Sequence, residues 1–241
     1  MQNSELATVA VVLPGTGSDA HFADRAFRAP LEALGVRIVA IEPDPRRVVD
    51  GYLDAMDRAA DTHGRIIVGG VSIGAAVALQ WAADNPDRTV SVLAALPAWT
   101  GSADDAPAAA SARFTAGQLR SEGLESVIAA MLASSPAWLG AELERSWRSQ
   151  WPDLPAALDE AASYHSLGES ALRAVGVPVG IASAMDDPVH PASVAQAWAA
   201  SLPRGAVATT TLDMIGRDPA VLGSTCIKAL AAIESDTTAS A

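Results

Sequence analysis

Cysteine, aromatic residues and positive charge are all scarce in this sequence of 241 residues. The single cysteine, Cys226, excludes an intramolecular disulfide, and its apolar neighbours predict a buried packing thiol rather than a nucleophile. Only 16 Lys and Arg stand against 28 Asp and Glu, giving a net charge of −12 without any basic patch. Nucleic acid and anionic membranes are therefore not expected as partners, because both require clustered positive charge.

Long apolar runs are also missing. No stretch approaches the roughly 18 apolar residues that a membrane-spanning helix needs. The first apolar segment, 6–13, is short and follows Glu5 instead of a basic stretch, so it does not resemble a secretory leader. These features predict a soluble, cytoplasmic protein. Aromatic residues make up 5% of a chain that is 50% hydrophobic, so Ala, Val and Leu must build the core, as suits parallel strands covered on both faces.

Short apolar, β-branched runs alternate with longer helical segments along most of the chain. This alternation is typical of βαβ units and predicts an α/β fold with a mostly parallel sheet and helices on both faces. Strands are predicted at 8–13, 37–41, 66–69, 89–96, 177–183 and 206–212, and helices near 22–34, 46–62, 74–85, 191–202 and 219–233.

The interval 99–175 interrupts this rhythm, because it holds Ala-rich helical stretches and no convincing strand. A structureless loop of that length is implausible inside a compact domain. We therefore predict a helical cap at 99–175, inserted into a core formed by 1–98 and 176–241, with a disordered polar tail at 235–241. Trp138, Trp147 and Trp151 in the cap either line a substrate pocket or pack the cap onto the core.

The strongest chemical motif is a G-x-S-x-G sequence from Gly70 to Gly74, centred on Ser72. It follows a buried strand and precedes an apolar helix, which is the context of a nucleophile elbow, where a strained turn exposes the serine hydroxyl. The helix N-terminus adds positive partial charge beside a developing oxyanion. The structural alternative is that Ser72 only caps the helix.

The loop after the first strand runs Pro14-Gly15-Thr16-Gly17-Ser18. A hydrolase places one oxyanion donor in such a loop, here the backbone N–H of Thr16, and the other at the residue after the nucleophile, Ile73. Phosphate binding is the alternative for a glycine-rich loop before a helix. However, no G-x-x-x-x-G-K-[ST] is present, and a G-x-G-x-x-G spacing fails because position 20 is Ala.

A third motif follows the predicted strand at 177–183, where Asp186 and Asp187 precede His190 and Pro191. With these residues the chain resembles the α/β-hydrolase family. The resemblance extends from 8 to 233 in the order of elements, with Pro14-Gly15 in place of the usual His-Gly. It implies that Asp187, four residues before Pro191, is the acid of a catalytic triad and that Asp186 is a solvent-exposed neighbour. Alternatively, Asp187 only caps the turn that follows.

The sequence departs from this family pattern at the base, because the expected histidine after the last strand corresponds to Arg217. Arginine stays protonated and cannot accept the serine proton, although it could form an ion pair with Asp187. His190, on the expected rim of the site, is the best substitute base, followed by His21 beside the 14–18 loop. His63 is expected at a helix C-terminus and His165 on the surface of the cap.

These residues predict a serine hydrolase-like enzyme that acts on a small to medium apolar ester or thioester. Ser72 would attack the carbonyl, with Asp187 orienting His190 as the base. The alternative is a non-hydrolytic or ligand-binding protein of the same fold that lacks a functional triad, in which Arg217 would bind a carboxylate or phosphate. No metal or organic cofactor is implied, because no group of His, Cys and carboxylates has the spacing of a metal site.

Overall fold

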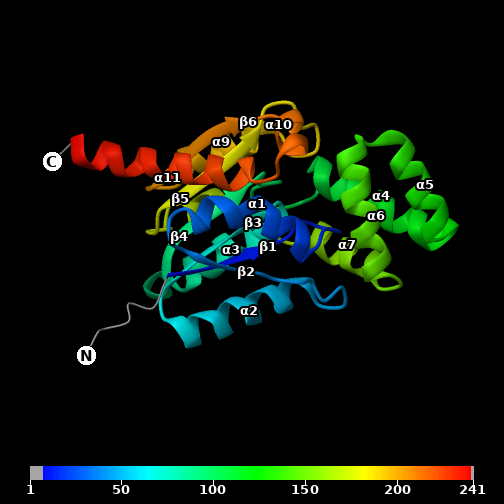
Figure 1. Cartoon of the computed structure of the whole chain (residues 1–241), viewed down its shortest axis with the longest axis horizontal. Helices are drawn as coiled ribbons and strands as arrows, with labels where there is room; N and C mark the ends of the chain where they lie inside the picture. The colour runs from blue at the N-terminus through cyan, green and yellow to red at the C-terminus, as the bar shows by residue number, and fades with distance from the viewer. Residues whose placement is uncertain (1–7, 240–241) are drawn as a thin grey trace.

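The computed structural model describes residues 8–239 and contains one sheet of six strands in the order β2-β1-β3-β4-β5-β6 (Figure 1). All neighbouring strands run parallel. This confirms the six predicted strands, and no strand end differs from its predicted position by more than two residues. The strands are β1 (Val9–Leu13), β2 (Arg37–Ala40), β3 (Ile66–Val71), β4 (Thr89–Ala95), β5 (Val179–Ala184) and β6 (Gly205–Thr210).

Helices cover both faces of the sheet, as predicted. One face carries α1 (Ala20–Glu32) and α11 (Val221–Ala239), and the other carries α2 (Val48–His63), α3 (Ile73–Asp84) and α9 (Ala192–Ser201). A short 3₁₀ helix, Pro86–Arg88, leads into β4. Every residue of β1 and β5 is buried, as strands that are covered on both faces require.

The order of the strands alone shows where a ligand-binding crevice lies in this fold. The chain passes from β1 outward to β2, then returns to the other side of β1 to form β3. The loops after β1 and β3 therefore diverge and leave a crevice at the carboxyl ends of the strands, where open α/β sheets bind their ligands. The loop 14–18 follows β1, and Ser72 follows β3.

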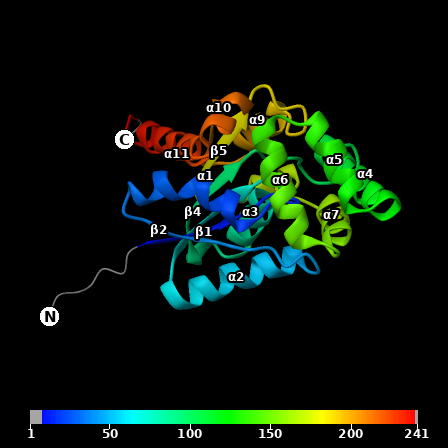
Figure 2. The ribbon, with the colours of Figure 1, turned by 45° about the vertical axis from the view of Figure 1, so that its right-hand side comes forward.

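Five helices lie between β4 and β5, within the predicted cap interval. The first four gather at one end of the sheet, to the right of the core in Figure 1 and over the front of it in Figure 2, whereas the short last one packs against α9. Residues of the first four pack into a small apolar cluster of their own. The helices are α4 (Pro107–Glu122), α5 (Leu124–Ser134), α6 (Ala137–Gln150), α7 (Leu154–Ser163) and α8 (Glu169–Leu172).

The structure differs from the sequence-based prediction at two places near the C-terminus. A short helix, α10 (Leu212–Arg217), occupies what was predicted to be the end of the last strand and the loop after it. In addition, α11 continues to Ala239, so most of the predicted disordered tail at 235–241 is helical instead. Ser235 Oγ donates to the carbonyl of Ala231 one turn earlier, at 3.0 Å, which supports this extension. Residues 240–241 lie outside the described residues.

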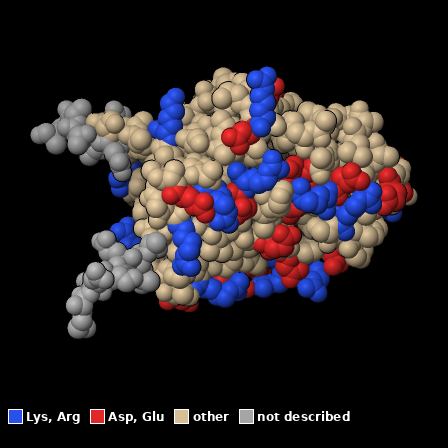
Figure 3. Space-filling model, viewed as in Figure 1, with Lys and Arg blue, Asp and Glu red and all other residues tan. Residues whose placement is uncertain are grey.

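Two expectations about the rest of the chain can be checked directly. Cys226 is fully buried in α11, and burial raises the pKa of its thiol to about 12, which confirms a packing role. Within residues 8–239, none of the helices combines the length and apolar character that crossing a bilayer demands. On the face seen in Figure 3, acidic and basic side chains intermingle rather than separate into patches of one sign.

Candidate active site

Ser72 lies on the turn between β3 and α3, as the motif predicts. Its backbone has φ +56° and ψ −116°, a conformation that non-glycine residues adopt at a cost of about 1–3 kcal/mol and only where the surroundings hold them. One such restraint is the hydrogen bond from Ser72 N to the carbonyl of Ala95 on β4, at 2.9 Å. Ser72 lines a cavity at this end of the sheet, so the strained turn presents the residue to that space.

The glycines that flank Ser72 are required by close backbone contacts. A Cβ atom on Gly70 would lie 2.6 Å from the carbonyl oxygen of Leu13 at the end of β1. A Cβ atom on Gly74 would lie 2.6 Å from the carbonyl oxygens of both Leu13 and Pro14. These separations are too short for real atoms, so only glycine allows the elbow to pack against the strand and loop beside it.

His190 joins Ser72 to Asp187. Its Nε2 lies 3.0 Å from Ser72 Oγ, and its Nδ1 lies 2.8 Å from Asp187 Oδ2. The side chains of His190 and Asp187 are 17% and 6% exposed, so solvent competes little with these contacts. The tautomer that satisfies both carries its proton on Nδ1, which leaves Nε2 free to accept the serine hydroxyl. This is the arrangement of a nucleophile, a general base and an orienting acid.

Asp187 is held as a carboxylate by several donors at once. Burial is the largest single influence on its pKa and would raise it, but the hydrogen bond and charge of His190, together with two backbone N–H groups, outweigh burial. The backbone N–H groups of Val189 and His190 also donate to Oδ1, at 2.8 and 3.2 Å. The net result is a pKa below the usual value of 3.8. Asp187 therefore caps its own turn, as the structural alternative predicts, and contacts the imidazole at the same time.

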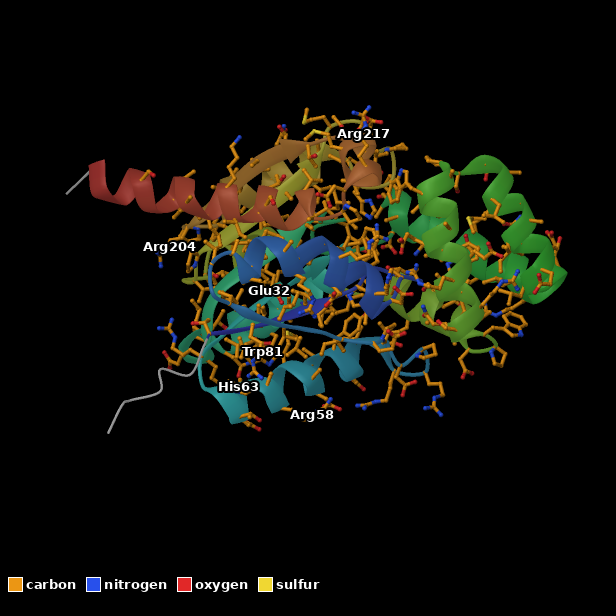
Figure 4. All side chains as sticks on the ribbon, in the orientation of Figure 1. Glu32, Arg58, His63, Trp81, Arg204 and Arg217 are labelled. Atoms are coloured by element: carbon orange, nitrogen blue, oxygen red, sulfur yellow. The ribbon has the colours of Figure 1, made fainter. Side chains whose placement is uncertain are left out.

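Arg217 does not take the place of a histidine in this arrangement. The proposed ion pair with Asp187 is absent, and Arg217 instead pairs with Asp213 at 2.9 Å, one turn away on α10. Its side chain is 77% exposed and lies at the outer surface of the molecule beside α10 (Figure 4). The physical reason is the helix itself, which makes residues four apart neighbours on one face. Of the two partners considered for Asp187, the structure thus has His190 and not Arg217.

The remaining histidines lie away from Ser72. His21 is mostly exposed and approaches Glu142 of the cap at 3.8 Å. His63 ends α2, where it contacts Arg37, and Figure 4 shows it far from the cap helices. His165 is exposed, in agreement with its predicted surface position. Asp186 is exposed too, and its Oδ1 accepts a hydrogen bond from Leu212 N at 2.8 Å, tying the acid loop to the start of α10.

Two backbone N–H groups beside Ser72 are available to an oxyanion. Ile73 is the first residue of α3, so its N–H has no acceptor within the helix. Thr16 lines the cavity, and neither its N–H nor that of Ile73 has a hydrogen-bond acceptor among residues 8–239. A Cβ atom on Gly15 would lie 3.5 Å from Ser72 Cβ, which places the 14–18 loop directly beside the elbow. The sequence-predicted donors thus belong to the elbow and to the loop beside it, and neither is paired within the described part of the chain.

The cavity above Ser72 has a volume of about 810 Å³ and is walled by both the core and the cap. Its lining is mostly apolar and includes Phe22, Leu96, Met131 and Leu143. Of the cap tryptophans considered from the sequence, Trp138 and Trp147 line it, whereas Trp151 is 40% exposed and lies outside. Trp138 and Trp147 therefore both line the cavity and pack within apolar clusters, whereas Trp151 does not line it.

Several contacts between the cap and the core were not predicted. A Cβ atom on Gly216 would lie 2.4 Å from the ring of Trp138, so α10 packs tightly against α6. Ser146 and Gln150 on α6 donate to the backbone of the 14–18 loop. Their four-residue spacing places them on one helix face, but nothing in the sequence identifies the loop, more than 120 residues earlier, as their partner.

One group of potential metal ligands, Asp19, His21 and Glu142, lies where α1 meets the cap. Both oxygens of Asp19 already accept hydrogen bonds from Arg145, at 2.9 Å each, and Oδ1 also caps α1 through Phe22 N. Glu142 contacts Arg145 as well as Arg25. Arginine side chains thus supply the positive charge that a cation would bring, and the group forms an ion-pair network between core and cap.

Comparison with known proteins identifies the fold. No protein-family model matches the sequence, and no curated protein matches it. Among solved structures, a carboxylesterase from the thaumarchaeon Nitrososphaera gargenis has 14% identity and a TM-score of 0.74, covering 98% of this chain and 94% of the other. The enol-lactonase from Burkholderia xenovorans LB400 has 17% identity and a TM-score of 0.66, with coverages of 88% and 85%.

A hydrolase from Pseudomonas aeruginosa PA01 is similar to the same degree, with 19% identity, a TM-score of 0.66 and coverages of 93% and 90%. These likenesses extend over nearly the whole of both chains. The chain therefore has the α/β-hydrolase fold, with an inserted helical cap, as the order of its sequence motifs predicts. At these identities the likeness concerns the fold, and the chemistry has to be argued from the site.

Proposed function

We propose that this protein is a serine hydrolase that cleaves carboxylic esters or thioesters with a small to medium apolar acyl group. The observation that carries the proposal is the position of His190, which contacts Ser72 Oγ through one ring nitrogen and Asp187 through the other. The solved structures of similar fold include a carboxylesterase and an enol-lactonase, whose reactions are of this class.

In the proposed reaction, Ser72 Oγ adds to the carbonyl carbon while its proton passes to His190 Nε2. The carbonyl oxygen becomes an oxyanion that the N–H groups of Thr16 and Ile73 bind. The imidazolium then donates the proton to the leaving alcohol or thiol as its bond to the carbonyl carbon breaks, leaving an acyl-serine. Water, deprotonated by the same imidazole, attacks the acyl group, releases the acid and restores the serine.

The cavity favours neutral substrates over anionic ones. Within the described part of the chain, its lining includes Asp187 and Glu142 but neither Lys nor Arg. A substrate carboxylate or phosphate in the cavity would thus find no Lys or Arg counterion in the lining, which makes burying its charge costly. Arg217, which the ligand-binding alternative needs for this purpose, is not among the lining residues. An uncharged apolar acyl group matches the wall that is present.

The direct test is labelling with a fluorophosphonate probe together with hydrolysis of p-nitrophenyl esters of increasing acyl length. The native protein is expected to label and to turn over esters, and Ser72→Ala is expected to do neither. Removing a member of such a triad typically lowers turnover by roughly 10⁴–10⁶. A native protein that neither labels nor hydrolyses any ester in the series would favour the ligand-binding alternative instead.

A further inference from the structure

The cap helix α6 makes direct hydrogen bonds to the backbone of the 14–18 loop. Ser146 Oγ donates to the carbonyl of Gly17 at 2.6 Å, and Gln150 Nε2 donates to the carbonyl of Ser18 at 2.9 Å. Gln150 Nε2 also donates to Ser146 Oγ at 2.8 Å, so both amide hydrogens are used. The two side chains are 0% and 4% exposed, and they form a buried polar chain that ends on the loop.

The loop passes this restraint on to Thr16 through planar peptide groups. The carbonyl of Gly17 and the N–H of Ser18 belong to one rigid peptide, so fixing one fixes the other. The N–H of Ser18 donates to the carbonyl of Gly15 at 3.0 Å. That carbonyl shares its peptide with the N–H of Thr16. Orientation is therefore transmitted from α6 to the Thr16 N–H in two hydrogen-bonded steps.

The loop is held equally firmly on its other sides. The buried hydroxyl of Tyr52 on α2 donates to the carbonyl of Pro14 at 3.2 Å. Gly17 has φ +67°, and a Cβ atom there would lie 2.9 Å from Trp147 Nε1 of the cap. The carbonyls of Pro14, Gly17 and Ser18 thus accept hydrogen bonds from side chains of α2 and α6, while the Thr16 N–H has no acceptor within residues 8–239.

We propose that Ser146 and Gln150 are positioning residues that aim the Thr16 N–H at the oxyanion. This inference rests on the proposed hydrolase function. It gives the cap a role beyond covering the substrate, because the geometry of the oxyanion site then depends on the seating of α6. Apolar residues could fill the same space, but only hydrogen-bond donors in this order can fix the orientation of the peptides.

The test compares Ser146→Ala with the control Ser149→Ala. Ser149 lies on the same helix, and its hydroxyl donates to the carbonyl of Ser146 rather than to the loop. For Ser146→Ala, kcat for a p-nitrophenyl ester is expected to fall about 10- to 100-fold, less than the roughly 10²–10³ seen when an oxyanion donor is removed outright. KM is expected to stay within about threefold, because the substrate carbonyl gains most from the donor in the transition state.

A boronic acid inhibitor provides the readout that a merely structural role would not change. Its adduct with Ser72 places a tetrahedral oxygen where the oxyanion forms, so its Ki should rise in parallel with the fall in kcat. Gln150→Glu is a second variant of nearly the same size. The carboxylate of this variant would accept a hydrogen bond from the Ser146 hydroxyl and repel the carbonyl oxygen of Ser18. We therefore expect kcat to fall at least as far as in Ser146→Ala. If Ser146→Ala does not fold, Gln150→Glu carries the same test.

The possible outcomes separate this inference from the function on which it rests. Esterase activity in the native protein that is lost in Ser72→Ala supports the function independently of α6. Given that activity, wild-type kcat in both α6 variants, or a reduced kcat with unchanged boronic acid Ki, would overturn the positioning role alone. A native protein without any esterase activity would overturn the proposed function and the positioning role together.

Discussion

Asp187 and His190 lie three residues apart in one loop, and Asp187 Oδ2 is 2.8 Å from His190 Nδ1. The acid and the candidate base are therefore carried by the same turn. Val189 and His190 also donate backbone N–H groups to the carboxylate, so the turn is built around the acid that orients the imidazole.

The position of His190 predicts that substitutions at His190 and at Arg217 affect esterase turnover very differently. His190→Gln is expected to reduce esterase turnover by roughly 10⁴ or more, because the glutamine cannot accept the serine proton. Arg217→His is expected to leave turnover within about twofold, since that side chain faces solvent on α10. Ester hydrolysis by the purified variants checks both. A gain in activity from Arg217→His would show that the base belongs after β6.

Asp187 should make stability depend on pH. Its pKa is lowered in the folded protein, so its stabilising contribution is present above the unfolded value of about 3.9 and is lost as the pH falls through the folded pKa. Asp187→Asn cannot show this effect. The difference in free energy of unfolding between native protein and variant should therefore shrink as the pH falls below about 4. Denaturant titrations across this range provide the measurement, and a constant difference down to pH 3 would contradict it.

The elbow glycines should tolerate no side chain. Gly74→Ala places a Cβ atom 2.6 Å from two backbone oxygens, and overpacking of this kind typically costs about 1–3 kcal/mol or more. Gly117→Ala is the matched control, because its Cβ atom meets nothing within 4 Å on α4, where alanine is favoured over glycine by about 0.5–1 kcal/mol. Chemical denaturation should show destabilisation only for Gly74→Ala. Equal stability of the two variants would contradict the packing of elbow against β1.

Acyl-chain preference should respond to the part of the cavity that α5 forms. Ala130 lines the cavity and Ala129 does not, although both are exposed neighbours on that helix. Ala130→Phe should lower kcat/KM for long acyl esters by about 3- to 10-fold, since each displaced methylene is worth about 0.8 kcal/mol, and leave acetate esters unchanged. Ala129→Phe should behave as the native protein does. A uniform loss across all chain lengths would place the acyl group elsewhere.

The fold and the elbow could be predicted because their signals are local. Strand 66–71 is apolar throughout, and helix 73–84 is apolar except for Gln80 and Asp84. The turn between them requires glycine, so the sequence alone positions Ser72. His190 was ranked first among four histidines because it lies beside Asp187 in the chain. Whether His190 or Arg217 contacts Asp187 was left open, since that depends on α10, whose short helix turns Arg217 outward.

The contacts made by the cap could not be predicted, because they join residues far apart in sequence. Ser146 and Gly17 are separated by 129 positions, and Asp19 and Arg145 by 126. Neither partner carries a local signature of the other. The end of α11 was missed for a different reason: the composition of 235–241 is polar and small, yet the helix continues from its buried part to Ala239.

Because Asp187 and His190 share one turn, other parts of the molecule can change in sequence without disturbing the contact between them. With acid and proposed base in one segment, proton transfer does not require a side chain from β6 or from the residues after it. The residues after β6 can therefore vary to suit their contacts with the cap, as Gly216 does where it packs against Trp138. We therefore expect libraries randomised in α10 to retain the chemistry while altering substrate choice, whereas insertion of a single residue between 187 and 190 would abolish turnover outright.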